Sequence, residues 1–141
     1  MLDIISTYEN YLSKVKKASG NTVSSYMRDI RQFSDWLERT ERIELLNAVQ
    51  QNISAYLTHL QDQGKSGATV SRTLASLKNF YVYAVSSGFL EASPITDQIH
   101  VDRGERKPPQ ILTGREVELL LSQPVTTDSK GLRDKAMLEV M

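Results

Sequence analysis

Apolar residues recur at helical spacing in four successive segments, and this periodicity limits what the chain can fold into. Residues three, four and seven positions apart lie on one face of an α-helix, so each segment predicts a helix with one apolar side. No segment alternates with period two for long enough to indicate a strand. The stripes are formed by Ile4, Tyr8, Tyr11 and Val15, by Val23, Met27, Ile30, Phe33 and Leu37, by Val49, Ile53, Tyr56 and Leu60, and by Val70, Leu74, Leu77, Tyr81 and Ala84. We therefore predict an all-α fold that begins with a compact four-helix bundle.

Glycines and N-capping residues predict where these helices begin and end. Gly20, Gly64 and Gly88 follow the first, third and fourth stripes, where glycine favours helix termination. The second helix should begin at Asn21 or Thr22, because either side chain could accept a hydrogen bond from a free backbone amide. We detect no internal repeat along the chain.

The pattern changes after the fourth helix. Residues 99–110 combine several charges with Pro108 and Pro109, and proline lacks the amide hydrogen that a helix needs, so this stretch predicts an extended linker. A new helix should begin at Thr113, because Glu116 follows three residues later in the capping-box pattern.

A last helix should begin near Ser129 and runs to the final residue without a stop signal. Two short helices cannot bury a core of their own. We therefore expect a first domain over residues 1–98, a linker over residues 99–110, and the truncated start of a second domain over residues 111–141.

Composition narrows the class of protein. The chain has no cysteine, which excludes disulfides, thiolate metal sites and a cysteine nucleophile. It shows no secretory signal and no apolar run long enough to span a membrane, so we expect a soluble cytoplasmic protein. Lys plus Arg total 17 and Asp plus Glu total 17, whereas most nucleic-acid binders are basic. If this chain binds nucleic acid, its cations and anions must gather on different faces.

The predicted fourth helix meets that condition. Three cations and no acidic residue occur between Lys65 and Ser87. Short polar side chains accompany these cations, a combination that suits a helix placed in the major groove of DNA, although many solvated helix faces look similar. The face opposite the apolar stripe, its N-terminal end and its flank carry Lys65, Thr69, Arg72, Ser76, Lys78 and Asn79.

The predicted second helix offers a weaker counterpart. Thr22, Ser25 and Arg28 lie in its first half, where free amides and the helix dipole favour a phosphate. Asp29, Asp35 and Glu38 dilute this cationic character. Helix capping together with ordinary surface pairs four residues apart would explain the same residues.

Motifs for chemistry are absent from the sequence. We find no glycine-rich phosphate loop, no metal-ligand spacing and no serine-hydrolase motif, so we expect no metal, no cofactor and no catalytic residue in this chain. His59 and His100 are isolated. The six tyrosines fall within the four-helix region, and most lie on or beside the apolar stripes, where they are ordinary packing residues.

Three stretches of the chain resemble the tyrosine recombinase (phage integrase) family, most closely its Xer branch. The first resembles the start of the family's second helix and comprises Asn21, Thr22, Tyr26, Asp29 and Phe33. The second resembles its fourth helix and comprises Thr69, Arg72, Leu74, Leu77, Phe80 and Tyr81, followed by Gly88 and Pro94. The third and most specific comprises Leu112, Thr113, Glu116, Val117, Leu120, Leu121 and the run from Gly131 to Glu139.

This resemblance implies a SAM-like core-binding domain that binds double-stranded DNA at a recombination core site, followed by the start of a catalytic domain. It implies that the full-length parent is a site-specific recombinase that cuts and rejoins DNA through a covalent phosphotyrosine, with its catalytic residues beyond this chain. The parent would form a homo- or hetero-tetramer on DNA, and this chain alone a monomer or weak dimer. The family's helices nominate as DNA contacts Thr22, Ser25, Arg28, Thr69, Arg72, Ser76 and Lys78.

Two other hypotheses remain open from the residues. One is a non-catalytic helical DNA-binding regulator, which would share the cationic helix face. The other is a helical protein-interaction module, which a net charge of zero favours slightly.

Overall fold

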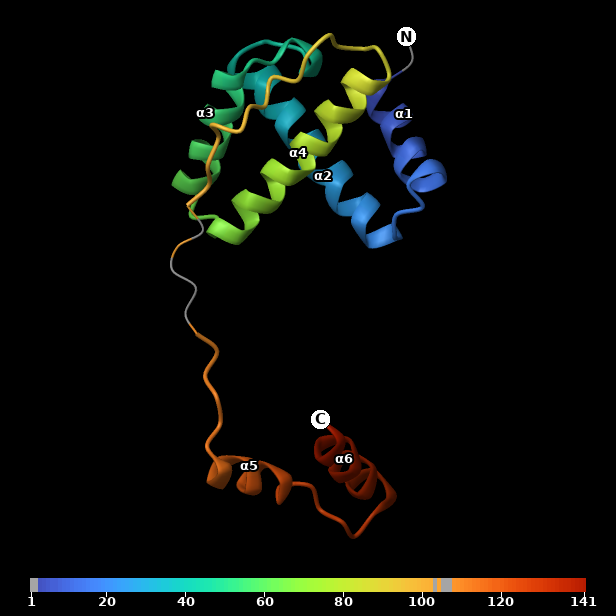
Figure 1. Ribbon diagram of the computed structural model, residues 1–141, viewed down its shortest axis with the longest axis vertical. Coiled ribbons are helices and arrows are strands. Elements are labelled where there is room, and N and C mark those ends of the chain that lie inside the picture. Colours follow the sequence, from blue (N-terminus) through green and yellow to red (C-terminus); the bar gives the residue numbers. More distant parts are fainter. Residues whose placement is uncertain (1–2, 103, 105–107) are drawn as a thin grey trace. The chain divides into compact units, whose positions relative to one another are not determined.

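The structure is a computed structural model that describes residues 3–102, 104 and 108–141. Its chain forms two compact units, residues 1–105 and 106–141. Every regular element within the described residues is a helix, which confirms the all-α class (Figure 1). The first unit contains α1 (Ile4–Asn10), a π-helix η1 (Tyr11–Val15), α2 (Gly20–Thr40), a 3₁₀ turn η2 (Leu45–Asn47), α3 (Gln50–Asp62) and α4 (Gly67–Ser86). The second contains α5 (Gly114–Leu121) and α6 (Ser129–Val140).

Two long helices, α2 and α4, cross at the centre of the first unit. Helix α1 packs against α2, and α3 packs against both α2 and α4. In Figure 1 the N-terminal ends of α2 and α4 point toward the same edge of the bundle, and their C-terminal ends point toward the opposite edge. Side chains on the N-terminal halves of α2 and α4 therefore lie on the same side of the domain.

The core lies between these helices and follows the predicted stripes closely. Ile30, Phe33, Leu77, Phe80 and Tyr81 are completely buried where α2 and α4 meet. Aromatic rings from α1 join this core, since Tyr8 packs edge-on against Phe80 with ring centroids 5.3 Å apart. Burial of this apolar surface is the main force that holds the four-helix body together.

The first predicted stripe is wrong at its C-terminal end. The α-helix gives way at Tyr11 to one turn of π-helix, whose wider hydrogen-bond ring shifts the register of the residues that follow. Leu12 is consequently buried, whereas Val15 is 68% exposed. Val49 is exposed as well, because it is the N-cap of α3 rather than part of its apolar face.

Helix α2 begins earlier than predicted, and both long helices have a serine N-cap. Ser19 caps α2 and Ser66 caps α4, and the helices begin at the glycines that follow. The predicted caps Asn21 and Thr22 therefore lie inside the first turn of α2. The serine caps belong to a short internal repeat that our sequence analysis missed. The sequence Ser-Gly-x-Thr-Val-Ser begins at residue 19 and again at residue 66.

The chain that follows α4 folds back over the bundle. Gly88 ends the helix with a positive φ of 77°, a conformation that glycine adopts without strain. Leu90 and Ile95 then pack against the core, as do Ile99 and Val101 within the expected linker.

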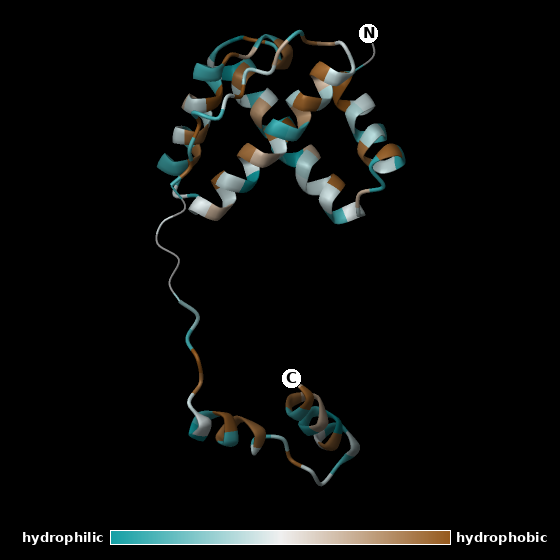
Figure 2. Cartoon of the chain, viewed as in Figure 1, coloured by the Kyte–Doolittle hydropathy of each residue, from teal (hydrophilic) through white to brown (hydrophobic). Residues whose placement is uncertain are grey.

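The second unit, taken by itself, buries little. Gly131 is the only buried residue of α5 and α6. Apolar side chains such as Leu119 and Met137 are more than half exposed, and Figure 2 shows this hydrophobic character along α5. The capping box at α5 is confirmed: the amide of Thr113 donates to Glu116 Oε2 at 2.8 Å, and the amide of Glu116 donates back to Thr113 Oγ1 at 3.4 Å. Among the described helices, none is both long and apolar enough to cross a bilayer.

Candidate nucleic-acid interface

The N-terminal ends of α2 and α4 have nearly identical geometry. Ser19 Oγ accepts a hydrogen bond from the amide of Thr22 at 3.3 Å, and Ser66 Oγ accepts one from the amide of Thr69 at 3.2 Å. In each cap the serine and threonine hydroxyl oxygens are 2.9–3.0 Å apart. The other first-turn amides of each helix stay free of these caps and carry the positive end of the helix dipole.

The repeat extends to the point where the two helices cross. Asp29 on α2 and Ser76 on α4 occupy equivalent positions 47 residues apart, and Ser76 Oγ donates to Asp29 Oδ2 at 2.8 Å. Arg72 Nη2 donates to Asp29 Oδ1 at 3.0 Å. The Asp29 side chain is only 2% exposed, so α4 neutralises a carboxylate that α2 buries at the crossing.

Charge segregates along the bundle. The segment from Tyr11 to Arg28 carries four cations and no acidic residue, and the segment from Gln63 to Leu90 carries three cations and no acidic residue. The C-terminal half of α2 and the turn after it carry acidic residues instead, including Asp35, Glu38, Glu41 and Glu44. Because both N-terminal halves point toward one edge, that edge is cationic although the chain is neutral overall.

Most of the nominated residues are accessible at this edge or along its helices. Arg28 and Lys65 are exposed, and Thr22, Ser25 and Thr69 are half-buried near the helix starts. The Arg72 side chain is 48% exposed. Their placement is compatible with contact to a polyanion.

Three more nominated residues, all on α4 and in addition to Arg72, contact other side chains of the protein. Ser76 was expected on the exposed face, but it is completely buried, because the side of α4 that carries it packs on α2 and its hydroxyl is bound to Asp29. That expectation was wrong, and Ser76 cannot touch DNA in this conformation. Asn79 is exposed and donates to the hydroxyl of Tyr26 at 3.3 Å. Lys78 lies 3.7 Å from Asp97 and belongs to the part of α4 beyond the crossing.

Asp29 does not weaken the cationic edge as the sequence suggested. From the sequence alone, Asp29 is one of the acids that dilute the cationic character of α2. Its burial and its ion pair with Arg72 remove it from the surface. Asp62, at the end of α3, is exposed three residues before Lys65 and remains the nearest acid along the chain to the start of α4.

Sequence reasoning missed a group of lysines beside the start of α2. Lys14 lies in the last turn of η1, Lys16 and Lys17 lie in the turn that leads to the Ser19 cap, and all three are exposed. Lys17 has a positive φ of 51°, which helps the chain reverse direction before α2. Three lysines within four residues, immediately before a capped helix, are the pattern that could have revealed them.

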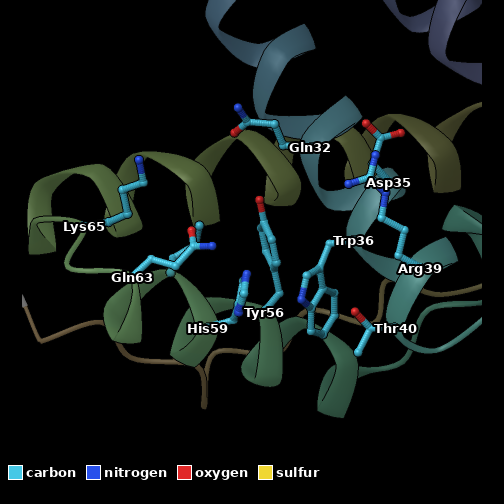
Figure 3. A pocket seen from close by; sticks show the side chains of 10 residues that line it. Gln32, Asp35, Trp36, Arg39, Thr40, Tyr56, His59, Gln63 and Lys65 are labelled. Atoms are coloured by element: carbon cyan, nitrogen blue, oxygen red, sulfur yellow. The ribbon is translucent and has the colours of Figure 1, made fainter.

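A groove of about 320 Å³ opens between α2 and α3, and Figure 3 shows its lining. The rings of Trp36, Tyr56 and His59 lie side by side there, with Trp36 5.2 Å from Tyr56 and 5.9 Å from His59 between centroids. Burial raises the pKa of Tyr56 to about 12, with a further contribution from the charge of Asp29, so its phenol is neutral at pH 7. These rings pack against one another, as expected for the tyrosines. No group of acidic, histidine or cysteine side chains arranged to hold a metal ion occurs among the described residues.

Comparison with known proteins defines the class of this fold. Residues 5–88 match the family described as phage integrase, N-terminal SAM-like domain. The match runs from the second residue of α1 to just beyond the end of α4 and so covers almost all of the four-helix body. The chain belongs to this family.

Named relatives extend the similarity over the full chain. A protein of Caldanaerobacter subterraneus subsp. tengcongensis, whose name assigns it to the tyrosine recombinases, is 39% identical over 98% of this chain and 47% of its own length. Tyrosine recombinase XerD of Staphylococcus epidermidis is 32% identical over 100% of this chain and 48% of its own length. Tyrosine recombinase XerC of Roseiflexus is 28% identical over 100% of this chain and 45% of its own length. The chain thus spans about half the length of the curated relatives it matches. No solved structure gave a match.

Proposed function

We propose that the four-helix unit binds double-stranded DNA through the cationic edge formed by the N-terminal halves of α2 and α4. One observation carries the proposal: the segments that lead into and form these halves carry six cations and no exposed acid, while the exposed acids of α2 lie toward its other end. The six cations are Lys14, Lys16, Lys17, Arg28, Lys65 and Arg72. Capped helix N-termini with exposed Arg and Lys side chains suit phosphate oxygens. Family membership supports the same assignment.

Arg28 and Lys65 are the residues best suited to test this proposal. Both are exposed, and neither takes part in an ion pair or side-chain hydrogen bond among the described residues. If about four cations of the edge contact phosphates, log K should fall against log salt with a slope of about −4. Arg28→Ala or Lys65→Ala should weaken binding and reduce that slope by about one.

The experiment is a fluorescence-anisotropy titration with a labelled mixed-sequence duplex of about 30 base pairs, at several salt concentrations from about 50 to 200 mM. Arg39→Ala is the matched control, because Arg39 is an exposed arginine on the same helix but in its last turn. The proposal fails if the parent chain does not bind at the lowest salt, or if Arg39→Ala weakens binding as much as Arg28→Ala.

For the whole protein we propose a site-specific tyrosine recombinase that acts in the cytoplasm as a tetramer on its DNA site. The four-helix unit would supply one half of a clamp around the duplex, and residues 99–110 would link it to a catalytic domain that begins near residue 111. In that domain arginines would stabilise charge on the scissile phosphate, and a tyrosine would form the covalent link to DNA. The two relatives named XerD and XerC support this assignment.

A further inference from the structure

The carboxylate of Asp29 connects the helix crossing to the cationic edge. Each of its oxygens accepts one hydrogen bond from α4: Oδ2 from Ser76 at 2.8 Å and Oδ1 from Arg72 at 3.0 Å. Ser76 is completely buried, and Arg72 lies one helical turn closer to the start of α4. The three residues therefore form a short line from the core to the surface.

Arg72 is bound at only one corner of its guanidinium group. Within the described residues its side chain is hydrogen-bonded and paired with Asp29 alone, through Nη2. The side chain is 48% exposed, and a planar guanidinium has further N–H donors in a fixed fork. Holding one corner on a buried carboxylate restricts the rotamers of a long flexible side chain, so the remaining donors face solvent in a limited set of directions.

We propose that Asp29 is a positioning residue, which holds the Arg72 guanidinium so that its free donors meet the DNA backbone. This inference rests on the proposed function of the cationic edge. Asp29 itself touches no DNA, because it is buried at the crossing. Because Asp29 restrains the Arg72 side chain before DNA binds, Arg72 loses less conformational entropy on binding.

The sign of the effect separates positioning from simple electrostatics. Asp29→Asn removes a negative charge, so an account based on charge alone expects tighter DNA binding. Positioning expects weaker binding, because the hydrogen bond from Arg72 is no longer charge-assisted and restrains the side chain less. The amide can still accept from Arg72 through its oxygen and donate to the Ser76 hydroxyl, which can turn, so the fold should persist.

The test measures affinity for the same mixed-sequence duplex in five variants of the whole chain, one of which is Arg72→Lys. We expect Asp29→Asn to weaken binding about fivefold, and Arg72→Gln to weaken it at least as much. In the double variant Asp29→Asn/Arg72→Gln the Asp29 change should add nothing further, because its effect passes through Arg72. Glu38→Gln is the matched control: it neutralises an exposed acid on the same helix and should bind as tightly as the parent chain or more tightly.

Three results would overturn the inference. The first is that Asp29→Asn binds DNA as tightly as the parent chain. The second is that Asp29→Asn weakens binding by the same factor whether residue 72 is Arg or Gln. The third is that Arg72→Lys binds DNA as tightly as the parent chain. Arg72→Lys preserves the charge without the fork, so it also decides the matter if Asp29→Asn does not fold. If the parent chain binds DNA and binding weakens in Arg28→Ala but not in Asp29→Asn, the inference about Asp29 is wrong and the proposed function still holds.

Discussion

Replacing Arg72 by alanine should destabilise the four-helix unit before any DNA is added. The substitution leaves the Asp29 carboxylate buried with Ser76 as its remaining hydrogen-bond donor. Removing one partner of a fully buried ion pair costs about 3–5 kcal/mol. Arg72 is 48% exposed, so water already screens part of its interaction, and water can reach the space it vacates. We therefore expect a loss of about 2 kcal/mol, within the range for a hydrogen bond to a charged group.

For a domain of this size, a loss of about 2 kcal/mol corresponds to a fall of roughly 8–16 °C in the midpoint of thermal unfolding. The midpoint can be followed by far-UV circular dichroism of the whole chain. Lys65→Ala removes an equal charge from an exposed position that has no ion-pair partner among the described residues, and it should change stability by less than about 0.5 kcal/mol.

Equal midpoints for Arg72→Ala and Lys65→Ala would refute the reasoning, because they would mean that the buried carboxylate does not need its arginine. A loss as expected has a practical consequence. DNA affinities of Arg72→Ala must then be measured well below its melting midpoint, whereas Arg28→Ala and Lys65→Ala report on DNA contact without this complication.

Three further predictions concern other parts of the chain. Tyr81→Phe should cost about 1–2 kcal/mol in urea unfolding, because the buried Tyr81 hydroxyl donates to the carbonyl oxygen of Leu45 at 2.8 Å, and an unchanged midpoint would contradict this role. Gly131→Ala should lower the free energy of unfolding by about 3 kcal/mol or more and remove hydrogen-exchange protection from α6, because the new Cβ would collide with the backbone carbonyl of Val125. Gly114→Ala is the control and should be neutral, because a Cβ at Gly114 meets nothing within 4 Å. Hydrogen bonds from the backbone and side chain of Thr113 lower the pKa of Glu116 below its ordinary 4.5. The capping box should therefore be intact above pH 4.5 and be lost as the pH falls through the folded-state pKa of Glu116. An NMR titration that places the pKa of Glu116 at or above 4.5 would refute this prediction.

Local chemistry in the sequence was enough to predict most of the helices and their faces. Core residues such as Ile30, Phe33 and Leu77 follow from periodicity alone, and the capping box at Thr113 follows from spacing. Periodicity failed at Val15, because a single π-turn shifts the register and no composition rule marks where such a turn will occur.

The candidate site was harder to predict because its decisive contacts are long-range. Ser76 was assigned to the face opposite the stripe that begins at Val70, although Phe80 and Tyr83 share its side of α4 and are buried as well. The contact between Ser76 and Asp29 shows that α2 covers this side. The role of Asp29 was hidden for the same reason, since its partners lie 43 and 47 residues further along the chain. The internal repeat could have revealed this crossing, because it aligns Asp29 with Ser76 and Phe33 with Phe80.

Zero net charge is compatible with DNA binding because charges act over a limited distance in salt water. The Debye length is about 8–10 Å at physiological ionic strength. Helix α2 has 21 residues, and at 1.5 Å per residue its first turn lies roughly 25 Å from Glu38 and Glu41 near its other end. Repulsion between those acids and a duplex at the first turn is therefore mostly screened, while the nearby Arg and Lys side chains interact directly with phosphates. At salt concentrations near 0.01 M the Debye length grows to about 30 Å, and the far acids then begin to oppose binding. The balance of charge over the whole chain thus matters less for this surface than the distance over which its opposite charges are separated.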